Sequence, residues 1–115
     1  MNKLMLCAAA VILFSSSAFT ADRMTFNGEI MDSSCAAAGS HTAMMNEHKI
    51  KDARACTLGC VKNGAKYVLY DQATKTTYEL DDQAKPEEFA GQDVKVRGKL
   101  DAAGKTIHVE NISRS

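Results

Sequence analysis

Residues 93–112 read DVKVRGKLDAAGKTIHVENI, and this stretch decides the class of fold. Apolar and polar residues alternate over 93–100 and again over 105–112, which is the period of a strand with one buried face. The intervening segment 101–104 ends in Gly104, a residue that tolerates the positive φ of a hairpin turn. The stretch therefore predicts a β-hairpin near the end of the chain.

Three segments upstream also have strand character. Residues 24–31 (MTFNGEIM) alternate in the same way, whereas residues 66–71 (KYVLYD) and 76–80 (TTYEL) are rich in β-branched and aromatic residues. Residues 85–91 (KPEEFAG) have an early proline, acidic residues in the first turn and a final glycine, which predicts one turn of helix.

The chain between the first two strands has a different pattern. Residues 35–52 show neither the alternation of a strand nor the apolar stripe of a helix. We expect an excursion there with one helical piece over 42–48. Residues 52–64 (DARACTLGCVKNG) predict a short helix that begins after Asp52 as N-cap and ends at Asn63 and Gly64.

Five short strands in this arrangement predict a mainly β fold, a small five-stranded OB-like Greek-key barrel with a helical, Cys/His-rich excursion between strands 1 and 2. Gly28 and Gly98 in mid-strand suit the sharp bends of a closed barrel. An open β-sandwich is the alternative. Residues 22–115 form one domain in either case.

Composition excludes several functional classes. The chain has 115 residues, of which 45% are hydrophobic, and 14 basic residues balance 14 acidic ones. The apolar fraction is too high for a disordered chain. Neutral charge without a basic block argues against a nucleic-acid partner and against attraction to anionic membranes.

Residues 1–21 have the pattern of a secretory signal peptide, with Lys3, a short apolar run and then small residues. Ser16 and Ala18 favour cleavage within 18–21. We therefore expect a periplasmic or secreted protein with no membrane span after cleavage, the alternative being an uncleaved N-terminal anchor helix.

Processing changes the cysteine count. Of the 4 cysteines only Cys35, Cys56 and Cys60 follow the signal peptide. An odd number of cysteines in an exported chain cannot pair completely within it. One thiol must be free, pair between chains or bind a ligand.

The sequence has one concentration of metal-type ligands: Cys35, Cys56, Cys60, His41 and His48. Cys56 and Cys60 lie four residues apart and share a helix face, so the three thiols and one histidine would make a tetrahedral zinc site. Copper(I) is the other candidate, with Met44 or Met45 as a soft ligand.

The same cysteines allow two other hypotheses. A disulfide from Cys35 to Cys56 or Cys60 would pin the excursion to the barrel, whereas a bond between Cys56 and Cys60 does not suit a regular helix. In a thiol-redox protein Cys56 is the better nucleophile, because it lies near the predicted helix start and close to Arg54.

Three motifs carry a resemblance to a known group. Residues 28–35 (GEIMDSSC), 56–69 (CTLGCVKNGAKYVL) and 90–100 (AGQDVKVRGKL) resemble small exported bacterial proteins of unknown function that are described as OB-like domains. The likeness covers almost all of the chain after the signal peptide. It implies the fold and the exported compartment, and it implies no activity.

Together these patterns predict an exported binding module with a Cys/His-rich site for zinc or copper, and not an enzyme. The alternative is a structural or interaction domain in which the cysteines form a stabilising disulfide and a barrel face binds an unknown ligand or protein. A thiol-redox role is the third hypothesis.

Overall fold

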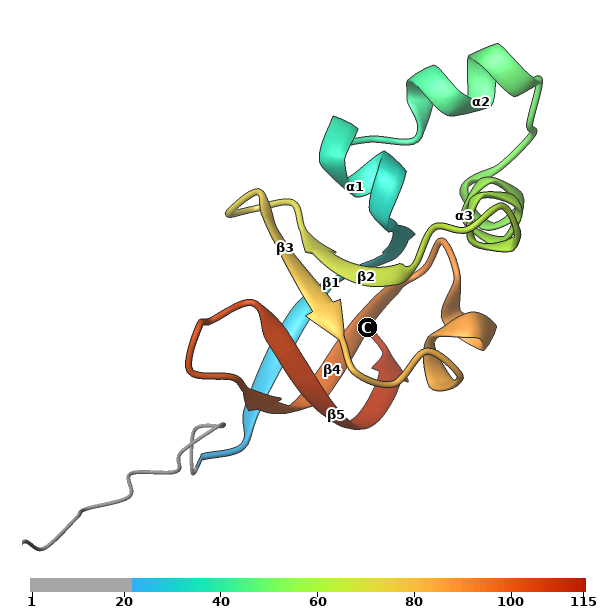
Figure 1. Ribbon diagram of the computed structural model, residues 1–115. Coiled ribbons are helices and arrows are strands. Elements are labelled where there is room, and N and C mark those ends of the chain that lie inside the picture. The colour runs from blue at the N-terminus through green and yellow to red at the C-terminus, as the bar shows by residue number, and fades with distance from the viewer. Residues whose placement is uncertain (1–21) are drawn as a thin grey trace, which may run out of the picture.

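The structure, a computed structural model, describes residues 22–115 (Figure 1). The predicted signal peptide lies outside the described residues. The elements are β1 (Met24–Asp32), α1 (Ser33–Ala38), α2 (Thr42–His48), α3 (Ala53–Lys62), β2 (Tyr67–Asp71), β3 (Thr76–Leu80), the 3-10 helix η1 (Lys85–Phe89), β4 (Asp93–Leu100) and β5 (Thr106–Arg114).

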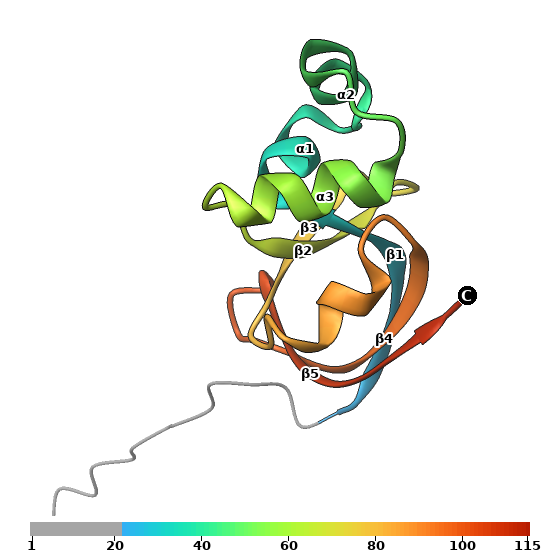
Figure 2. The same cartoon turned by 90° about the vertical axis from the view of Figure 1, so that its right-hand side faces the viewer.

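The five strands form one sheet that closes on itself in the order β1-β2-β3-β5-β4, which we call the strand ring. Neighbouring strands are antiparallel except β3 and β5, which pair in parallel at Leu80 and Ile107. The ring is visible in two perpendicular views (Figures 1 and 2). The mainly β prediction with five strands is confirmed, and the open sandwich is wrong because β1 pairs with both β2 and β4.

Two glycines allow the backbone to bend where the strands cross closely. A Cβ atom on Gly28 would lie 2.5 Å from the Tyr70 carbonyl oxygen, and one on Gly98 would lie 2.1 Å from that of His108. Gly98 also lies at an irregularity in the register of β4 with β5. Any side chain at these positions would force the strands apart, which explains both mid-strand glycines.

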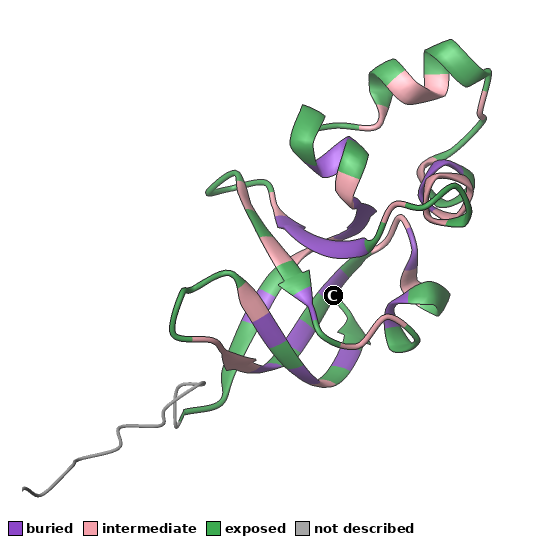
Figure 3. Cartoon of the chain, viewed as in Figure 1, coloured by how far each residue is buried: buried purple, intermediate pink, exposed green. Residues whose placement is uncertain are grey.

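Two apolar clusters share β2 as a common wall. Tyr67 and Leu69 point into the cluster inside the ring, whereas Val68 and Tyr70 point into a smaller cluster under the helices. Figure 3 shows β2 buried along most of its length. The strand is covered on both sides because the helical excursion, residues 33–66, packs against the outside of the ring.

The helices follow local sequence signals, with one exception. Helices α2 and α3 and the turn η1 are confirmed, and the Asp52 carboxylate accepts a hydrogen bond from the Ala55 amide at the start of α3. Helix α1 was not predicted. It forms because Asp32 caps its first turn and Gly39, with φ of 80°, ends it.

No helix among residues 22–115 has the length and apolar content needed to cross a membrane.

Candidate metal centre

The cap of α1 fixes the first cysteine. Asp32 ends β1, and its Oδ2 atom accepts hydrogen bonds of 3.0 Å from the amides of Ser34 and Cys35. These two bonds satisfy amides that the first turn of a helix leaves without partners. Cys35 is consequently held in the first turn of α1, where its side chain is completely buried.

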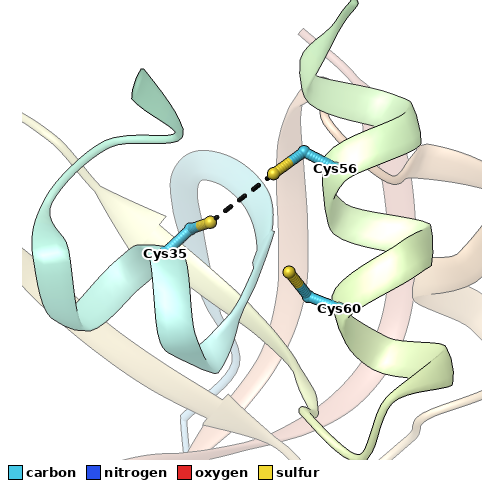
Figure 4. A group of neighbouring side chains, drawn as sticks. All are labelled: Cys35, Cys56 and Cys60. Carbon is cyan, nitrogen blue, oxygen red and sulfur yellow. Dashed lines mark hydrogen bonds between the residues drawn. The ribbon is translucent and has the colours of Figure 1, made fainter. Parts of the chain in front are cut away.

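The other two cysteines come from α3. The N-cap Asp52 sets the start of this helix, and the spacing of four places Cys56 and Cys60 on the same face. Both side chains point toward Cys35 (Figure 4). Cys56 is completely buried, whereas Cys60 is partly exposed.

The three thiols form one compact group, the three-thiol cluster. The Sγ atoms of Cys35 and Cys56 lie 3.8 Å apart, and all three sulfur atoms, including that of Cys60, lie within 4.8 Å of one another. Cys35 and Cys56 are in contact but not bonded, because a disulfide requires about 2.05 Å between sulfur atoms. The structure therefore brings the three predicted cysteines together.

The surroundings of the cluster raise the pKa values of two of its thiols, Cys35 and Cys60. Burial raises the pKa of Cys35, and the neighbouring carboxylate of Asp32 raises it further. Burial also raises the pKa of Cys60 to about 11, with the charges of Asp32 and of Cys56 as the next causes. A thiolate in this site needs a compensating cation.

His41 joins the site through a different set of atoms. Asp32, Cys35 and His41 offer three ligand atoms within 4.8 Å of one another. The Nε2 atom of His41 lies 2.6 Å from Oε2 of Glu29, and the side chain of His41 is only 10% exposed. The groups that contain the thiols and the histidine thus have Cys35 in common.

Three buried polar atoms in or beside the excursion lack a hydrogen-bond partner: Asp32 Oδ1, His41 Nδ1 and Thr57 Oγ1. Buried polar groups are nearly always hydrogen-bonded, so each exception needs an explanation. For Asp32 Oδ1 and His41 Nδ1 the explanation offered by the geometry is a ligand, since both residues belong to a group that can hold an ion.

His48 lies apart from the thiols, at an exposed position at the end of α2. It faces Cys60 across a cavity of about 410 Å³, and Met44 and Ser34 also line this cavity. Neither group of converging ligand atoms contains His48. The structure thus places His41 at the site and His48 at its entrance.

The redox hypothesis requires an exposed thiol, and Cys56 is not one. Its side chain is completely buried, and the Arg54 guanidinium donates a hydrogen bond to the Glu88 carbonyl, away from the cluster. Cys60 is the cysteine that reaches the surface, but its raised pKa leaves little thiolate near neutral pH.

Two acidic residues of the site were missed by the sequence reasoning. Asp32 directly follows the predicted strand 24–31, and Glu29 lies within it, so the strand pattern accounts for both positions without a ligand role. The signal for Asp32 was present, since an aspartate followed by two serines is a helix N-cap pattern. Glu29 had no comparable signal, because its contact with His41 depends on how the excursion folds back.

The fold and the site define a small, mainly β domain with a buried group of metal-type ligands beside its strand ring. Residues 59–115 match the model of a family described as "Protein of unknown function (DUF5818)". The matched region contains the strands β2 to β5 and Cys60, but neither Cys35 nor Cys56. Comparison with curated proteins and with solved structures found no match.

Proposed function

We propose that this chain is an exported, single-domain OB-like module that binds zinc or copper(I) through Cys35, Cys56 and Cys60, and that it is not an enzyme. The OB-like assignment is supported by a closed ring of five strands with a helical insertion. Export to the periplasm or medium is supported by the sequence of residues 1–21.

One observation carries the proposal, the 3.8 Å between the sulfur atoms of Cys35 and Cys56. Two thiolates bound to one zinc at about 2.3 Å and at a tetrahedral angle lie about 3.8 Å apart. The third sulfur atom, from Cys60, lies within 4.8 Å of both.

The buried carboxylate of Asp32 is a second support. Its Oδ2 atom accepts two amide hydrogen bonds, but Oδ1 is buried and has no partner. An unpaired charge in a protein interior is costly unless a counter-charge is near. A cation at the adjacent thiols would supply that counter-charge.

Metal uptake must displace thiol protons, so affinity should depend on pH. Because the pKa values of Cys35 and Cys60 are raised, each bound thiolate releases a proton to solvent near neutral pH. We expect the affinity for the metal to fall by up to about tenfold, for each thiol that must lose a proton, with each unit by which the pH is lowered.

The fourth position distinguishes the two metals. The cavity next to Cys60 is lined by His48 and Met44. An imidazole suits zinc, whereas a thioether suits copper(I). His48→Ala should weaken zinc binding, and Met44→Leu should weaken copper(I) binding.

The test is a titration of the reduced protein with zinc and with copper(I), followed by native mass spectrometry. We expect a bound ion in the wild type and loss of binding in the triple Cys→Ser variant. His108→Ala is the matched control, because His108 lies on β5 beside Asp81. A wild-type protein that binds no ion in the presence of excess metal would refute the proposal.

A second candidate function is supported by the contact between the Cys35 and Cys56 thiols. In an oxidising compartment an external oxidant could take two electrons and two protons from this pair, leaving Cys60 reduced. The chain would then be a structural or interaction domain with an unknown ligand. The disulfide would be identified by an intact mass that is about two daltons lower without reductant than with it.

A further inference from the structure

The three-thiol cluster is continuous with a second group of potential ligands. Asp32, Cys35 and His41 converge within 4.8 Å, and Cys35 belongs to both groups. A thiolate has several lone pairs and can be shared between two ions. This arrangement places two potential metal positions side by side, with one sulfur atom between them.

The second group has the two polar atoms that lack partners. Asp32 Oδ1 and His41 Nδ1 are both buried and without a hydrogen bond. The side chain of Asp32 is fully buried, and that of His41 is nine-tenths buried. Both atoms have almost no surface exposed to solvent, and a bound ion is a partner that would satisfy both.

Glu29 completes a pattern typical of metal sites. Its carboxylate contacts His41 Nε2 at 2.6 Å, which orients the imidazole and leaves the other ring nitrogen, Nδ1, for an ion. Histidine ligands in proteins usually have such a carboxylate or carbonyl partner on the second nitrogen.

Charge balance favours two divalent ions over one. The three thiolates and the Asp32 carboxylate would together carry four negative charges, and three of these four groups are fully buried, Cys60 being partly exposed. One divalent ion would leave two of these charges uncompensated. Two divalent ions would neutralise the group, as burial requires.

We infer that Asp32, Cys35 and His41 form a second metal position beside the three-thiol site, so that two divalent ions share the Cys35 thiolate. This inference rests on the proposed metal-binding function. His41 and Glu29 also line a cavity of about 300 Å³ between β1 and the start of α2, which gives the second ion its own route to solvent.

Native mass spectrometry of the reduced protein, titrated with zinc alone, tests the inference. We expect two ions in the wild type, one in His41→Ala and one in Cys56→Ser. Cys35→Ser should hold none, because it removes the shared ligand. His108→Ala is the control and should hold two.

Asp32→Asn guards against misfolding as an explanation, because asparagine also caps helices. It should hold one ion and retain the circular dichroism of the wild type. A single ion in the wild type, or two ions that persist in both His41→Ala and Asp32→Asn, would overturn the inference while leaving the three-thiol site intact. No bound ion in the wild type would instead refute the proposed function.

Discussion

Inside the strand ring the buried side chains are aliphatic or aromatic, whereas the helical excursion encloses thiols, a carboxylate and a hydroxyl. The ring cluster includes Leu69, Val94 and Ile107, all without exposed surface. The buried polar residues among 22–115 are Asp32 and Thr57, and both belong to or adjoin the excursion. The ring cluster, with Leu58 and Val61 of α3 packed against it, is apolar, but the region of the excursion leaves polar atoms without partners.

This difference indicates separate roles for the ring and the excursion. Apolar burial stabilises a fold without any ligand. A region with unpaired buried polar groups reaches its full stability only when something binds there. The ring therefore serves as the scaffold, and the excursion is the part that responds to a metal.

The largest effect is expected from opening a cavity in the ring. Ile107→Ala should lower the free energy of unfolding by about 2–5 kcal/mol, because Ile107 is fully buried on β5. The loss, measured by urea unfolding, should be the same with and without zinc. A loss below about 1 kcal/mol would show that the ring is not the scaffold.

Removal of metal should act on the other region. A chelator should abolish a stabilisation of about 3 kcal/mol, the value for a ligand at one hundred times its Kd. Hydrogen exchange should then speed up in α1 and α3, while amides of β4 and β5 keep their protection. Equal acceleration of hydrogen exchange in the ring and in the excursion would contradict these separate roles.

A cap variant should have a smaller effect. Asp52→Ala removes the hydrogen bond of 2.7 Å to the Ala55 amide, and it should cost about 1 kcal/mol. Zinc affinity should fall as well, because α3 carries Cys56 and Cys60. Asp52→Asn is the matched control and should restore both stability and affinity, which thermal unfolding and zinc titration would measure.

A further effect is a pH dependence of the metal-free, reduced protein. The pKa of Cys60 is raised from the ordinary 9.0 to about 11, so the folded state holds a proton that the unfolded state releases. Stability from this group is present below pH 9 and is lost as the pH rises to about 11. The free energy of unfolding should therefore fall across this window.

Two variants isolate the contribution of Cys60 to this pH dependence. Cys60→Ser should weaken the fall in stability. Asp32→Asn should shift the fall in stability to lower pH. The charge of Asp32 is the second cause, after burial, of the raised pKa of Cys60. Urea unfolding between pH 7 and 11 measures both, and identical profiles for all three proteins would rule out the assigned cause.

The ring could be predicted because its signals are local. Alternation over 24–31, 93–100 and 105–112 follows from one face being buried, and Gly28 and Gly98 mark where strands approach closely. The pairing of β1 with both neighbours, which closes the ring, depends on tertiary contacts.

The site was predictable only in part. The helix spacing of Cys56 and Cys60 is local, whereas the position of Cys35 depends on α1, a helix of six residues. Its cap Asp32 ends a strand at the same time, so the strand signal concealed the helix signal. The position of His41 near Asp32 and Cys35 depends on how the turn after α1 folds back toward Glu29.

X-ray absorption spectroscopy of the zinc-loaded protein would show whether the thiols of the excursion bind the metal ion. We expect sulfur scatterers at about 2.3 Å from zinc, which disappear in the triple Cys→Ser variant. A first shell made only of nitrogen and oxygen atoms at about 2.0–2.2 Å would contradict this expectation.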